Sequence, residues 1–191
     1  VDLLWNGGIG TYVKASDESH DEVGDRNNDA VRIDASELRA RVVVEGGNLG
    51  FTPRARIEYA SAGGRINADY IDNSAGGNCS DREVNLKILL GLAVARGELT
   101  RKERDRLLAD CAGDVVEKIL ADNLAQANRL ALDEIESRER LDDYADLIGA
   151  LEASGHLDRR IDFLPSPEEL ADRGRDGRGL TRPELAAVLA H

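Results

Sequence analysis

The chain has 191 residues, of which 41% are hydrophobic, and it carries a net charge of −12. This length suits one large domain, or one small domain with part of another. The acidic balance argues against nucleic acid and anionic membrane surfaces as partners, because binding to both depends on lysine and arginine. No apolar stretch reaches the roughly 18 residues that a membrane span needs, and we therefore expect an acidic cytoplasmic protein.

The first five residues have no basic segment and no cleavage site, so they do not predict a signal peptide. They also lack Met and have the pattern of a strand interior, which indicates a piece of a longer protein. Without a secretory signal, Cys79 and Cys111 are expected to be reduced thiols. The three histidines are scattered and no Cys/His spacing suits zinc, so no metal site is expected.

Two strand ends are predicted in the first part of the chain. Residues 1–5 have the pattern of a strand that runs into a tight turn at residues 6–10. Residues 42–45, Val-Val-Val-Glu, predict a second strand, which Gly46-Gly47-Asn48 follows. In a parallel α/β sheet the ligand lies at the carboxyl ends of the strands, so this glycine turn is expected at the edge of a site.

Weaker signals complete the first part. Thr52 and Pro53 predict the start of a helix, as N-cap and first helical residue. The remaining predictions are a surface loop at residues 16–29, a short helix at 34–40, a weak third strand at 65–68, and a glycine-containing loop at 69–79 that leads into a helix. Lys14 and Lys87 are expected to be solvated or to snorkel along an apolar face.

The second part of the chain is predicted to be helical. Four sequences combine Ser or Thr with Glu three residues later, which is typical of a helix N-terminus; they are Ser80/Glu83, Thr100/Glu103, Ser166/Glu169 and Thr181/Glu184. Residues 141–153 predict another helix. Beyond Cys111 the apolar spacing predicts a helix packed along one face: Val116, Ile119, Leu120, Leu124, Ala127, Leu130, Ala131 and Ile135.

These signals predict an α/β fold class: a partial Rossmann-like parallel sheet followed by an all-α region. The division is expected near Ser80. Residues 1–79 would form the C-terminal part of a dinucleotide-binding domain, and residues 80–191 a helical region truncated at its end.

Several segments resemble the glutamate dehydrogenases and their amino-acid dehydrogenase relatives. Glu45-Gly46-Gly47-Asn48 followed by Thr52-Pro53 is similar to their Glu-Gly-Ala-Asn motif, and Asn73-Ser74-Ala75-Gly76 with Ser80 and Glu83 is similar to their Asn-Ala-Gly-Gly loop. The resemblance to the large NAD-specific bacterial enzymes spans nearly the whole chain. It is clearest in residues 4–14, 71–76, 79–85 and 179–185. Gly77, Asn78 and Arg82 depart from the pattern, which has Val, Asp and His there.

The resemblance implies a homo-oligomeric oxidoreductase that deaminates L-glutamate to 2-oxoglutarate with NAD as cofactor. It also implies that the phosphate-binding turn and the catalytic Lys and Asp lie upstream, so no catalytic residue is named in this chain. The isolated segment is expected to be inactive, and measurable turnover by it would contradict this. The choice of NAD over NADP comes from the resemblance alone.

The resemblance also assigns roles to five residues. Asn73 would hold the nicotinamide carboxamide, because an amide both donates and accepts. Asn48 would lie beside the nicotinamide ribose, and Gly7 and Gly8 would let the backbone approach the cofactor. Ser80, at a helix N-terminus, would hydrogen-bond the side-chain carboxylate of glutamate.

Plainer readings compete with these roles. Asparagines and glycines are common turn residues, Ser80 is first of all an N-cap, and Glu45 more often has a structural role than a catalytic one. A non-catalytic acidic helical domain that mediates subunit contacts is one alternative for the whole chain. Another is an amino-acid dehydrogenase that acts on leucine, phenylalanine or valine.

Overall fold

The computed structural model describes residues 1–191, apart from the side chain of Ala75. It is mostly helical, with short parallel strands near the N-terminus. The elements in chain order are β1 (Leu3–Asn6), β2 (Val13–Lys14), α1 (His20–Val23), η1 (Arg26–Asn28), β3 (Ile33–Asp34), η2 (Ala35–Glu37), β4 (Val42–Glu45), α2 (Pro53–Ser61), α3 (Asp69–Asp72), α4 (Ser74–Ala95), α5 (Arg101–Glu139), α6 (Leu141–Ala153), α7 (Pro167–Arg175) and α8 (Arg182–Leu189).

The strands pair in parallel, as the sequence predicts. β1 pairs with β4 in a register that sets Asn6 opposite Glu45, so the carboxyl ends of both strands lie at the same edge. β2 pairs with β3 in a second two-stranded sheet. The third strand expected at residues 65–68 is reduced to one parallel bridge between Val42 and Arg65.

Helix α2 packs beside the strands and closes the first core. Thr52 caps it through a hydrogen bond from the Ala55 N–H at 3.0 Å, and Pro53 is its first residue, as expected. The core beneath it is small, and its buried members are Val13, Ala35, Val43, Phe51, Ala55, Tyr59 and Ile66. This packing holds the ends of β1 and β4 in place.

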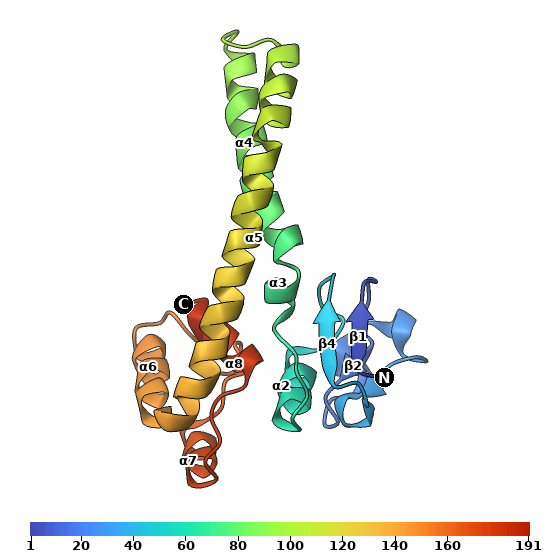
Figure 1. The fold of residues 1–191 in the computed structure, drawn as a ribbon. Coiled ribbons are helices and arrows are strands. Elements are labelled where there is room, and N and C mark those ends of the chain that lie inside the picture. Colours follow the sequence, from blue (N-terminus) through green and yellow to red (C-terminus); the bar gives the residue numbers. More distant parts are fainter.

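A long antiparallel hairpin of α4 and α5 projects from the rest of the molecule (Figure 1). Thr100 and Glu103 form the capping box that starts α5, and the boxes expected at Ser166 and Thr181 are also present. The prediction of a capping box at Ser80 is wrong. Helix α4 already begins at Ser74, so Ser80 is its seventh residue rather than its cap.

The apolar stripe predicted along α5 is only partly buried. Ile119 and Leu130 are 7% and 0% exposed, but four other members of the stripe are between 55% and 65% exposed: Val116, Leu120, Leu124 and Ile135. The expectation of one packed face is therefore wrong for most of the arm. Helix α4 covers only a narrow seam of α5, whereas the stripe is wider.

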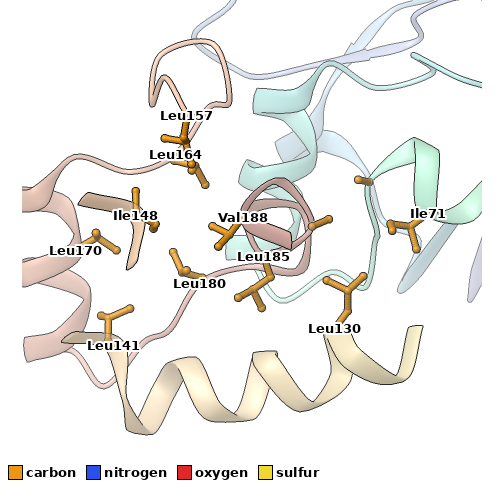
Figure 2. Packing of buried hydrophobic residues seen from close by; sticks show 12 residues of the cluster. Ile71, Leu130, Leu141, Ile148, Leu157, Leu164, Leu170, Leu180, Leu185 and Val188 are labelled. Carbon is orange, nitrogen blue, oxygen red and sulfur yellow. The ribbon is translucent and has the colours of Figure 1, made fainter. Parts of the chain in front are cut away.

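The larger core lies at the base of the arm, where α5 meets the last three helices. Figure 2 shows Leu130 of α5 directed toward the turn of α8 that carries Leu185 and Val188. Leu141 and Ile148 of α6 belong to the same cluster, together with Leu157, Leu164, Leu170 and Leu180. Because Ile71 also belongs to it, this core anchors the segment that leads into α4.

Two segments that the sequence predicts as loops contain helices. Residues 16–29 include α1, which begins at a capping box of Ser19 and Glu22, and the 3-10 helix η1. Residues 69–79 are helical on both sides of Asn73, in α3 and α4. Asn123 of α5 pins this junction, because its amide donates to the Ile71 carbonyl at 2.9 Å and to the Ser74 hydroxyl at 2.8 Å. The tertiary contact outweighs the low helix propensity of the glycines.

Candidate functional site

The candidate site lies at the shared carboxyl edge of β1 and β4. Gly7 and Gly8 follow β1, and the turn from Gly46 to Asn48 follows β4. The two turns touch, since a Cβ on Gly47 would lie 3.1 Å from the Gly8 carbonyl oxygen. A side chain at position 47 would therefore push the turns apart.

The two asparagines that the sequence singles out meet at this edge. The Asn73 amide nitrogen donates to the Asn48 side-chain oxygen at 3.0 Å. Asn48 is exposed and Asn73 is half-buried at the junction of α3 and α4. Within the described part of the chain, this pairing leaves the Asn48 amide nitrogen and the Asn73 amide oxygen without a hydrogen-bond partner. An open edge with one free donor and one free acceptor suits a carboxamide ligand.

Glu45 supports this edge from inside the protein. Its side chain is fully buried and forms an ion pair with Arg56 of α2, which is also buried. The same carboxylate accepts the backbone N–H of Gly50, so it closes the turn that carries Asn48. Arg56 stacks over the Phe51 ring at 5.5 Å from its centroid. Glu45 thus has a structural role, in agreement with the plainer reading of the sequence.

Two carboxylates of α3 hold the backbone on either side of Asn48. Asp72 accepts the backbone N–H of Glu45 at 3.2 Å, and Asp69 accepts the backbone N–H of Leu49 at 3.0 Å. Leu49 has a φ of 63°, a left-handed conformation that is unfavourable for a leucine. The Asp69 hydrogen bond helps to fix that conformation, and so the direction in which Asn48 points.

Two side chains of α3 have a raised pKa. Burial is the main cause that raises the pKa of Asp72, against the lowering effects of its hydrogen bonds from Asn67 and Glu45. Burial, reinforced by the charges of Asp69 and Asp162, raises the pKa of Tyr70 to about 12. The phenol therefore stays protonated at neutral pH.

Gly7 and Gly8, which follow β1, differ in the atoms that a side chain at each position would contact. A Cβ on Gly7 would lie 2.4 Å from the Trp5 ring, so the absence of a side chain there is explained by tryptophan packing. A Cβ on Gly8 would meet nothing closer than the Tyr12 hydroxyl at 3.7 Å. The backbone of Gly8 is the more open of the two toward a ligand.

Ser80 does not join this cluster. It is exposed on α4, six residues beyond Ser74, which corresponds to about 9 Å along the helix axis. Because it lies inside the helix, it cannot offer free N-terminal N–H groups to an anion. That part of its expected role is wrong.

The expectation of a solvated side chain is wrong for Lys14 and confirmed for Lys87. Lys14 is buried and paired with Asp34, instead of solvated, whereas Lys87 is exposed and paired with Glu83. Asp69 and Asp72 are not among the site residues that the sequence predicts. No local signal in the sequence points to them, because the backbone N–H groups that they accept lie 20 and 27 residues earlier in the chain.

Comparison of the sequence with known families identifies the class of protein to which the chain belongs. A family described as "Bacterial NAD-glutamate dehydrogenase, catalytic domain" matches residues 1–133. The chain belongs to this family.

Individual relatives match over all 191 residues. They are the NAD-specific glutamate dehydrogenases of Halomonas elongata at 53% identity, Pseudomonas aeruginosa at 52% and Mycobacterium tuberculosis at 47%. The chain spans 12% of the length of each of these relatives. Across the described residues, the structure contains no helix that is both long and apolar enough to cross a membrane.

Proposed function

We propose that this chain supplies the nicotinamide side of the cofactor site in an NAD-dependent glutamate dehydrogenase. The overall reaction would be the oxidative deamination of L-glutamate to 2-oxoglutarate and ammonia. The observation that carries the proposal is the hydrogen bond between Asn73 and Asn48 at the edge where β1 and β4 both end.

The residues present fit the cofactor in chemical type. The free amide groups of Asn48 and Asn73 would hold the carboxamide and the neighbouring ribose, and Gly8 would allow the backbone to approach. Bound NAD would accept the hydride, which requires that its ring be held against the amino acid in one orientation. Asp69, Asp72 and the buried Glu45 would keep the two amides in position.

Other parts of the proposal rest on the family likeness. Ser80 would contact the side-chain carboxylate of glutamate through its exposed hydroxyl, and residues 1–79 would end a Rossmann-like domain that precedes a helical region at 80–191. A cytoplasmic location agrees with the two free cysteines, Cys79 and Cys111.

A homo-oligomer is also part of the proposal. Exposed apolar side chains line both helices of the arm: Val84, Ile88, Leu89 and Leu92 on α4, and Val116, Leu120 and Leu124 on α5. Apolar surface of this kind commonly marks a protein interface. The arm would therefore contact another subunit.

Replacement of Asn73 by alanine in the full-length protein tests the cofactor role. We expect kcat/KM for NAD to fall by about 10- to 100-fold, since one hydrogen bond to the reacting group is lost. Asn27→Ala, at an exposed position away from the site, is the matched control and should leave the kinetics unchanged. If Asn73→Ala behaves like this control, the proposed role of Asn73 is wrong.

A further inference from the structure

The described residues form a cleft away from the asparagine pair. It has a volume of about 720 Å³ and lies between the end of α2 and the helices α5, α7 and α8. Among the described residues that line it, none is Gly8, Asn48 or Asn73. The cleft is therefore distinct from the proposed cofactor edge, and nothing in the cofactor proposal uses it.

The charge of this cleft is opposite to that of the chain. The chain as a whole has 37 acidic and 25 basic residues. In the part that the structure describes, one acidic residue lines the cleft, Glu134, and five arginines do: Arg65, Arg138, Arg173, Arg178 and Arg182. Arginine clustered in a concave site is typical of anion recognition, because its planar fork matches carboxylate and phosphate oxygens.

Two of these arginines form ion pairs within the protein, one largely buried and one exposed. Arg173 makes two hydrogen bonds of 2.8 Å to the buried carboxylate of Glu184. Arg178 pairs with Asp176 at 2.7 Å, but its side chain remains 55% exposed. Arg173 also lies in the last turn of α7, where a positive charge is favourable. The Arg173 pair is thus explained without a ligand, whereas the exposed Arg178 keeps donors that an anion can reach.

The other arginines have donors to spare. Arg182 donates its Nε to Asn67 at 2.7 Å, but its terminal nitrogens lie 3.5 Å from Glu134 and from the Ala127 carbonyl, at the long limit of hydrogen bonding. Glu134 is shared with Arg138. Across the described residues, Arg65 forms no ion pair at all. The cleft therefore keeps a positive excess after every internal pair is counted.

We propose that this cleft binds a compact polyanion that carries phosphate or carboxylate groups. Its volume lies within the roughly 300–1,000 Å³ typical of small-molecule sites. An anion there would bridge Arg65, which follows α2, to Arg178 and Arg182 of the helical part. It would thus tie the two parts of the chain together, in addition to the existing bond between Asn67 and Arg182.

Calorimetric titration of the full-length protein with pyrophosphate tests the proposal, and a parallel titration with propane-1,2,3-tricarboxylate distinguishes a phosphate ligand from a carboxylate ligand. We expect saturable binding of one or both probes, with the same affinity in the presence of saturating NAD. Arg65→Gln and Arg178→Gln should each weaken that binding by about tenfold or more, because each removes a charge-assisted contact. Neither residue belongs to the cofactor edge, and both side chains are exposed.

Arg106→Gln is the matched control, since Arg106 is an exposed arginine of α5 outside the cleft. It should change the affinity by less than twofold, and thermal unfolding should show that all three variants are folded. The proposal is overturned if neither probe binds, if NAD abolishes the binding, or if the cleft variants behave like Arg106→Gln. The outcome is independent of the role proposed for Asn73.

Discussion

Glu45 shows why the residues behind a site matter as much as those that face a ligand. It is fully buried beside Arg56, and together they hold the turn that presents Asn48. Glu45→Gln would keep an oxygen for the Gly50 N–H but would leave the Arg56 charge buried without its partner. We expect the free energy of unfolding to fall by about 3 kcal/mol or more, as measured by chemical denaturation.

Asp105→Asn provides the comparison for that substitution. Asp105 forms an ion pair with Arg104, and its side chain is 63% exposed. Exposed pairs contribute little, so a loss of about 0.5 kcal/mol or less is expected. Equal effects of Glu45→Gln and Asp105→Asn would show that burial of the Glu45 pair has no special importance.

Asp72 predicts a pH dependence with a definite sign. Because burial raises its pKa in the folded state, the folded protein binds its proton more readily than the unfolded chain does. Ionised Asp72 therefore costs stability at neutral pH, and this cost disappears as the pH falls through the raised pKa. Asp72→Asn removes the titration. The measured quantity is the free energy of unfolding of the wild type minus that of Asp72→Asn, from chemical denaturation at each pH. This difference should increase from pH 7 to pH 4. A constant or decreasing difference would contradict the raised pKa of Asp72.

At the scale of elements, the exposed apolar side chains on the arm of α4 and α5 predict a contact with another subunit. Ile88 and Leu92 are 56% and 52% exposed, one turn apart on α4. If this face contacts another subunit, Ile88→Glu/Leu92→Glu should lower the oligomeric mass of the full-length protein in light scattering. Arg106→Glu changes the net charge by the same amount at an exposed polar site and should leave the mass unchanged. An unaltered mass in the double variant would exclude this face from the subunit contact.

The sequence predicts elements well where one local signal decides them. The Val-Val-Val run of β4, the Thr-Pro start of α2 and the boxes at Thr100, Ser166 and Thr181 all depend on neighbouring residues, and the structure contains each of them. Ser80 has the same local signal, but there the contacts of Asn123 with Ile71 and Ser74 extend the helix backward past it. A tertiary contact of this kind leaves no local pattern.

The candidate site likewise has residues that local motifs predict and contacts that only the tertiary fold determines. Asn48 and Asn73 could be selected from their motifs, and the parallel register explains why they meet. The hydrogen bonds from the backbone N–H groups of Glu45 and Leu49 to Asp72 and Asp69 could not be predicted. They depend on where α3 lies relative to a turn that is about twenty residues earlier in the chain.

At the scale of the whole molecule, the structure combines two small cores with a projecting arm. One core fixes the strand ends, and the other fixes the base of α5 and the last helices (Figures 1 and 2). Asn73 lies where α3 passes into the arm, so the proposed cofactor contact is placed between the strand edge and the hairpin. Its position depends on both cores at once.

The most direct test is a structure of the full-length protein with NAD bound. The nicotinamide carboxamide should lie within hydrogen-bonding distance, about 3 Å, of the Asn73 side chain, with Asn48 beside the attached ribose. A nicotinamide ring bound away from the edge formed by β1 and β4, with both asparagines still paired only to each other, would contradict the account.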